Sequence, residues 1–62
     1  MILKRADRII QEVEILTNKS ISVDYLINVF DTSRQTIVND LKLLRKRGYN
    51  VKKVELGYYT IK

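Results

Sequence analysis

The chain has 62 residues, with 12 Lys or Arg against 7 Asp or Glu, which gives a formal net charge of +5. A chain of this length forms one small domain, 1–62, and its stability has to come from a packed apolar core. Cys and His are both absent, which excludes a disulfide framework and metal sites built from thiolate or imidazole ligands.

The first predicted element is an amphipathic helix that extends to Leu16. Its apolar residues form one stripe when they are plotted at about 100° per residue, and they are Ile2, Leu3, Ala6, Ile9, Ile10, Val13 and Leu16. Ile15 lies off this stripe, and with Ile2 and Leu3 it could form the apolar patch of a dimer. The alternative is a lone exposed isoleucine, which is common at protein surfaces.

A short strand and a second helix follow. In the sequence SIS, residues 20–22, a β-branched residue between two hydroxyls predicts a brief extended piece. Ser22 is suited to be the N-cap of the second helix because its side-chain oxygen can accept a hydrogen bond from a free backbone amide. The apolar face of that helix consists of Val23, Leu26, Ile27 and Phe30.

The third predicted helix, residues 33–47, follows the helix-breaking sequence DTS. Ser33 is a second candidate for an N-cap. The inner face of the helix consists of Ile37, Leu41 and Leu44. Gly48 is expected to end the helix because glycine takes the left-handed conformation without strain.

A β-hairpin over residues 50–62 is predicted because the apolar period changes from near 3.6 to 2 after the third helix. Its turn falls at Leu56-Gly57, between the runs YNVKKVE and YYTIK.

The tyrosines are divided by the alternation of side chains along the last strand. We expect Tyr59 and Ile61 to face the core, and Tyr58 and Thr60 to lie on the opposite face, with Tyr58 as the exposed ring. The remaining two, Tyr25 and Tyr49, are expected to be partly buried with a polar tip.

Taken in order, these elements predict an α+β fold. It is a small winged helix-turn-helix, with three helices followed by a two-stranded β-hairpin wing and a short strand near residues 20–22. In such a fold the helix at 33–47 can enter the major groove of DNA while the helix before it crosses the backbone and the hairpin at 50–62 serves as the wing.

The sequence LINVFDTSRQTIVNDLKLLRKRGYNV, residues 26–51, resembles the winged helix-turn-helix of bacterial transcriptional regulators. The similar families are the DeoR type, the biotin operon repressor type, and the amino-terminal domains of PRD-containing and Mga-like activators. The matching positions are Leu26, Phe30, Ser33, Arg34, Thr36, Ile37, Asp40, Leu41, Leu44 and Gly48. The resemblance implies a DNA-binding domain of a bacterial or phage regulator, either a repressor or an activator.

Basic residues concentrate in residues 34–53, which hold seven Lys or Arg against one acid, Asp40. A local excess of positive charge is typical of a domain that binds a polyphosphate, and a solvated basic face kept for solubility is the alternative. Asp40 itself is expected to be a local salt-bridge partner rather than a DNA contact.

The outer face of the third helix predicts the contacts to DNA. Gln and Asn can bind the N6/N7 edge of adenine, and Lys can reach guanine acceptors or phosphate. The expected base contacts are Arg34, Gln35, Val38, Asn39 and Lys42, and the expected phosphate contacts are Thr32, Ser33, Thr36, Lys46, Lys52, Lys53 and Tyr58. As alternatives, Gln35 and Asn39 are ordinary solvated positions, and Val38 packs against the wing.

No constellation in the sequence predicts catalysis, a cofactor, a metal site or a small-molecule ligand, because the carboxylates are scattered and no glycine-rich phosphate loop is present. The amino-terminal sequence MILKRADRII carries charges where a signal peptide is apolar, and no apolar run is long enough to span a membrane. We therefore expect a cytoplasmic, nucleoid-associated protein.

The predicted function is sequence-specific binding of double-stranded DNA by a transcriptional regulator. A homodimer is expected because one winged helix reads only a few base pairs. Two alternatives stay open: a winged helix that serves as a protein-interaction module, and an architectural recombination accessory factor of the excisionase kind.

Overall fold

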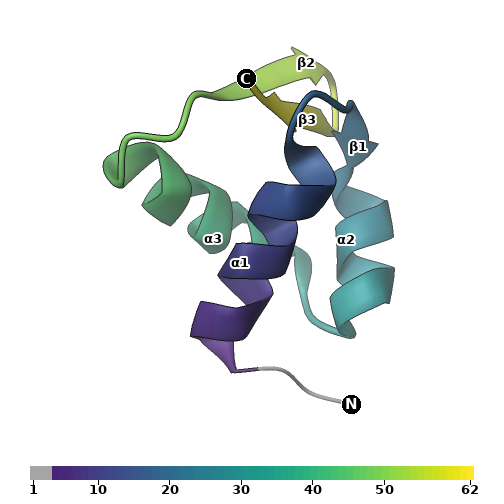
Figure 1. The fold of residues 1–62 in the computed structure, drawn as a ribbon. Coiled ribbons are helices and arrows are strands. Elements are labelled where there is room, and N and C mark those ends of the chain that lie inside the picture. Colours follow the sequence, from purple (N-terminus) through teal and green to yellow (C-terminus); the bar gives the residue numbers. More distant parts are fainter. Residues whose placement is uncertain (1–3) are drawn as a thin grey trace.

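A computed structural model describes residues 4–62 of the chain (Figure 1). The elements are α1 (Arg5–Leu16), β1 (Ile21–Ser22), α2 (Val23–Phe30), α3 (Arg34–Lys46), β2 (Val51–Glu55) and β3 (Tyr58–Ile61). In Figure 1 the sheet lies at one end of the helices, with α2 and α3 on either side of α1. The predicted α+β winged helix-turn-helix is confirmed.

The sheet has three antiparallel strands in the order β1-β3-β2. The short strand expected near residues 20–22 is present, and Ile21 and Ser22 pair with Tyr59 and Tyr58. The hairpin therefore gains a third strand from the segment between α1 and α2. The last strand of the chain lies in the middle of the sheet.

Both predicted N-caps are in place. The Oγ of Ser22 accepts a hydrogen bond from the backbone N–H of Tyr25 at 3.0 Å, and the Oγ of Ser33 accepts one from Thr36 at 3.2 Å. Between α2 and α3 the chain reverses through Asp31, whose φ of 49° lies in the left-handed region. These short-range contacts define the turn of the helix-turn-helix.

The core is built from one apolar face of each helix and the inner face of the sheet. Its members are Ile9, Leu16, Val23, Leu26, Phe30, Ile37, Leu41, Leu44, Val51 and Ile61. The predicted inner face of α3 is confirmed, since Ile37, Leu41 and Leu44 are all buried. This packing leaves the opposite side of α3 exposed.

The rotation of α1 differs from the prediction. Ile10, expected on the inner stripe, is 59% exposed, whereas Glu12 has no exposed surface. Ile15 is not a lone exposed isoleucine, because it is half-buried against the core. The other two members of the predicted dimer patch, Ile2 and Leu3, lie outside the described residues. The reason for the rotation is that α1 buries the flank that carries Arg8 and Glu12 against α3.

The faces of the last strand also need correction. Tyr59 and Ile61 pack on the core and Tyr58 is exposed, as predicted, but Thr60 is buried. The end of α1 covers it, since its hydroxyl donates to the carbonyl of Leu16 at 3.3 Å. Alternation along a strand does not predict that a helix from an earlier part of the chain covers the outer face of that strand.

Two further tyrosines are more exposed than expected. Tyr25 on α2 is 51% exposed and Tyr49, after α3, is 42% exposed. The prediction that they are partly buried is therefore wrong in degree. Each lies at an element end, where few neighbours can cover a large ring.

Candidate nucleic-acid interface

The outer face of α3 presents polar and basic side chains to solvent. Gln35, Asn39, Lys42 and Lys46 are exposed, and Val38 is half-buried beside them. The Nε2 of Gln35 donates to the Oδ1 of Asn39 at 3.0 Å, so the two amides of successive turns are held together. This bond leaves the amide N–H groups of Asn39 and the carbonyl of Gln35 free to bind a base edge.

The N-terminal turn of α3 carries three hydroxyl residues. Ser33 caps the helix, and its Oγ lies 2.9 Å from the Oγ1 of Thr36. Thr32 is half-buried in the turn before them. The predicted phosphate contacts therefore lie at the helix end where backbone amides point outward, but the Ser33 and Thr36 hydroxyls already bind one another.

Arg34 forms an ion pair that the sequence analysis missed. Its Nη2 donates to the Oδ1 of Asp24, in the first turn of α2. The side chains are 60% and 74% exposed, and ion pairs this exposed contribute little to stability. A phosphate or a guanine can therefore replace Asp24 as the partner of Arg34 at small cost.

Asp40 is the salt-bridge partner that was expected, but its partner comes from a distant part of the chain. Arg8 of α1 donates from Nε to Oδ2 at 2.6 Å and from Nη2 to Oδ1 at 3.1 Å. The Nε of Arg5 lies 3.4 Å from the same carboxylate. This fork joins α1 to the inner flank of α3, where Asp40 is buried.

Glu12 completes this cluster as a fully buried carboxyl. Its Oε2 lies 3.6 Å from the Nε of Arg8, and no N–H or O–H group of residues 4–62 donates to either oxygen. Burial, together with a hydrogen bond to Asp40 and the negative charge of Asp40, raises the pKa of Glu12 to about 9. The raised pKa favours the protonated form of Glu12, which can donate a hydrogen bond to Asp40.

The pKa values of the other two members, Arg8 and Asp40, shift in the directions that favour their charged forms. Desolvation alone raises the pKa of Asp40, but hydrogen bonds from Arg8 and Glu12 and the charges of the two arginines outweigh it, so the pKa is lowered. The hydrogen bond to Asp40 is the main cause of the raised pKa of Arg8. The cluster thus holds Asp40 ionised between guanidinium groups.

A shallow hollow of about 240 Å³ connects this cluster to the outer face of α3. Arg5, Arg8 and Asp40 line it together with Thr36 and Asn39. Arg5 is 57% exposed and adds a base beside Asn39 that the sequence analysis did not include. Arg5, Arg8 and Glu12 follow one another at helical spacing, which the sequence shows. The sequence does not show that this stripe faces α3.

The hairpin carries two basic side chains on successive residues of β2. Lys52 pairs with Thr60 and Lys53 with Tyr59, and both lysines are exposed. The expected alternation sends them to opposite faces, but both faces of this part of the strand are open to solvent. Tyr58, another predicted phosphate contact, is 40% exposed at the start of β3.

The turn of the hairpin is fastened to the rest of the domain. The carbonyl of Gly57 accepts a hydrogen bond from the backbone N–H of Val23 at 2.8 Å, at the start of α2. Gly57 has a φ of 81°, which a side chain disfavours. The wing is therefore short and held against the start of α2.

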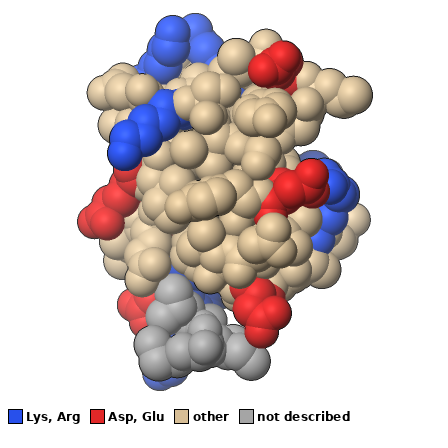
Figure 2. Space-filling model, turned by 90° about the vertical axis from the view of Figure 1, so that its right-hand side faces the viewer, with Lys and Arg blue, Asp and Glu red and all other residues tan. Residues whose placement is uncertain are grey.

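The α2 side of the molecule does not form a basic surface. Figure 2 shows this side, on which Lys and Arg are separated from one another by uncharged surface and by Asp and Glu.

Metal and membrane features are missing from the described part of the chain. Residues 4–62 contain no group of three or more acidic, Cys or His side chains that could hold a metal ion. Within the same range no helix has the length and apolar character to cross a bilayer.

Comparison with known proteins gives one match. The family model for an HTH domain matches residues 5–59, which is most of the chain and includes all of α1, α2, α3 and β2. No curated protein and no solved structure matches the chain with significance.

Proposed function

The chain belongs to the HTH domain family, a family of DNA-binding domains. From this we propose that it is a nucleoid-associated transcriptional regulator that binds specific sequences of double-stranded DNA. In this proposal α3 lies in the major groove and the β2–β3 hairpin flanks it as the wing. The observation that carries the proposal is the exposed amide pair of Gln35 and Asn39 on the outer face of α3.

The amide pair supplies the sequence information. Hydrogen-bonded to each other, Gln35 and Asn39 lose less side-chain freedom on binding than two independent side chains would. Their free groups match the donor and acceptor pattern of the major-groove edge of adenine. Lys42, one turn further along α3, reaches a guanine or a phosphate from the same face.

Phosphate contacts supply the affinity and the orientation. Lys46 extends the basic side of α3, and Lys52 and Lys53 contribute from the wing. On the other side, Arg5 can exchange Asp40 for a phosphate while Arg8 keeps α1 and α3 joined. Arg34 exchanges Asp24 for DNA in the same way.

We further propose that the protein acts as a homodimer, because the few base pairs under one α3 do not distinguish a site within a genome. The exposed Val54 and Leu56 of the wing, at 53% and 86%, favour a second candidate function, docking of another protein on the hairpin.

The test separates base contacts from phosphate contacts. Fluorescence anisotropy measures the affinity of each variant for a selected duplex and for a scrambled one at several salt concentrations. Gln35→Ala or Asn39→Ala is expected to cost about 1–3 kcal/mol on the selected duplex with little loss on the scrambled one. Changing both Lys52 and Lys53 to Ala is expected to weaken both duplexes alike and to lower the salt slope by about one unit for each lost phosphate contact.

Gln11→Ala, at an exposed position on α1 outside the site, is the control and should bind like the parent. If the Gln35 and Asn39 variants keep the parent's ratio of selected to scrambled affinity, α3 does not read the sequence. If the parent binds no duplex at all, the hairpin docking function gains support instead.

A further inference from the structure

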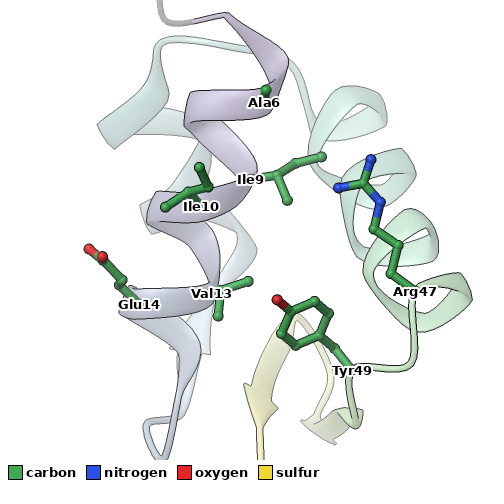
Figure 3. A pocket seen from close by; sticks show the side chains of 7 residues that line it. All are labelled: Ala6, Ile9, Ile10, Val13, Glu14, Arg47 and Tyr49. Carbon is green, nitrogen blue, oxygen red and sulfur yellow. The ribbon is translucent and has the colours of Figure 1, made fainter.

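A second hollow, of about 370 Å³, lies between α1 and the segment that follows α3 (Figure 3). Ile9 and Val13 lie toward its interior, and the exposed Ile10 and Tyr49 border it. Ile10 is 59% exposed and Tyr49 is 42% exposed, so the hollow has an apolar rim that water covers in the isolated chain. Apolar surface of this kind is typical of a contact with another macromolecule.

The two sides of the hollow carry opposite charges. Figure 3 shows Glu14 on the α1 side and Arg47, the C-cap residue of α3, on the other. Among residues 4–62 neither side chain belongs to an ion pair, although Arg5, Arg8 and Arg34 all do. The surface around the hollow is therefore apolar at its centre, negative on the α1 side and positive on the α3 side.

We propose that a second copy of this chain docks on this hollow, with a two-fold axis that runs along it. In a two-fold interface residue i of one copy contacts residue j of the other, and j contacts i. Rotation about an axis along the hollow turns the Glu14 side of one copy toward the Arg47 side of the other, twice. Ile10 and Tyr49 of the two copies pack between these two ion pairs.

A second copy is the occupant that the charges select. The surface is complementary to itself under this rotation, whereas any other protein would have to carry a matching pair of charges at the same separation around an apolar centre. The interface uses a different flank of α1 from the one that buries Arg8 and Glu12. It also shares no residue with the predicted DNA contacts, so both α3 outer faces stay available.

This inference deepens the homodimer proposed above, and it is tested without DNA so that its failure leaves the DNA-binding proposal standing. Sedimentation equilibrium of the full chain is compared for the parent, Glu14→Arg, Arg47→Glu and the double variant. Each single reversal places like charges against each other and is expected to weaken the dimer by at least about tenfold. The double variant restores opposite charges and is expected to recover the parent's dimer affinity.

Glu55→Arg and Lys62→Glu make the same changes of charge at exposed positions outside the hollow and should dimerise like the parent. Ile10→Asp is a further variant whose effect does not depend on the ion pairs, and it should be monomeric. Circular dichroism checks that every variant is folded. A parent that stays monomeric up to hundreds of micromolar overturns the inference, as do single reversals that dimerise like the parent or a double variant that does not recover.

Discussion

At the residue scale, the cluster of Arg8, Glu12 and Asp40 shows how burial changes what a carboxyl does. Two buried carboxylates next to each other repel, and a single proton removes the repulsion and forms a hydrogen bond in its place. Glu12 holds that proton because no group of residues 4–62 donates a hydrogen bond to its carboxyl oxygens, whereas the Asp40 carboxylate accepts two hydrogen bonds from Arg8. The buried site then contains one negative and one positive charge.

The raised pKa of Glu12 makes stability depend on pH. The unfolded chain loses the Glu12 proton near its ordinary value of 4.5, whereas the folded chain keeps it to about 9. Between these values the folded state binds more protons, so the free energy of unfolding falls as the pH rises and levels off above about 9. Glu12→Gln keeps the shape and the hydrogen bond to Asp40 without the ionisation, and is expected to show a flatter profile.

Urea denaturation from pH 5 to pH 9 measures this difference, with Glu55→Gln as a control because that carboxyl is exposed. The control should follow the parent. A parallel profile for Glu12→Gln and the parent means that Glu12 is ionised in the folded protein.

The residues that the sequence predicted well are those whose partners are close in the chain. Ser22 and Ser33 were identified as caps because a cap binds an amide three residues on. The partners of Asp40 and Arg34 were not identifiable, since they lie 32 and 10 residues away and depend on how the helices pack. The outer face of α3 was predicted correctly because its spacing is local. Arg5 was not included in the predicted interface because its position beside Asp40 depends on how α1 packs on α3.

At the scale of elements, α3 joins the two roles of the domain, because one side forms the core and the other forms the candidate interface. Leu41 is 3% exposed on the inner side, and Lys42 next to it is exposed. Leu41→Ala removes buried methyl groups from a small core and is expected to cost about 2–5 kcal/mol, enough to unfold much of the protein.

Lys42→Ala is the matched control, and its free energy of unfolding should lie within about 0.5 kcal/mol of the parent. Thermal and urea melts followed by circular dichroism measure both variants. An unchanged melting temperature for Leu41→Ala means that the helix is rotated from the orientation described.

The elements differ in how far periodicity defines them. For α3, three apolar residues at helical spacing fixed the inner side. For α1, Ile10 was predicted on the apolar stripe and Glu12 beside it, but Glu12 is the buried one, because α1 packs against Asp40 of α3. β1 was expected as an extended piece, but its pairing with β3 depends on residues more than 30 positions away.

At the scale of the whole molecule, the two proposed surfaces together determine the form of the DNA site. A two-fold dimer presents two copies of α3 related by the same axis, so the preferred site is expected to be an inverted repeat with its half-sites about one helical turn apart or a multiple of that. Selection of bound duplexes from a random pool, followed by sequencing, measures this. Recovery of single, unrepeated sites would contradict a dimer that binds symmetrically.

The position of β3 in the sheet affects when the domain can fold during its synthesis. β3 follows the other described elements in the chain and is the central strand of the sheet, and the backbone N–H of Asn18, after α1, donates to the carbonyl of Ile61 at 2.8 Å. On the ribosome, α1, α2 and α3 are complete before any residue of β3 exists, and short helices without a packed partner are marginal in water. The nascent domain therefore cannot close its core until Ile61 has emerged, and it folds in a single late step rather than helix by helix.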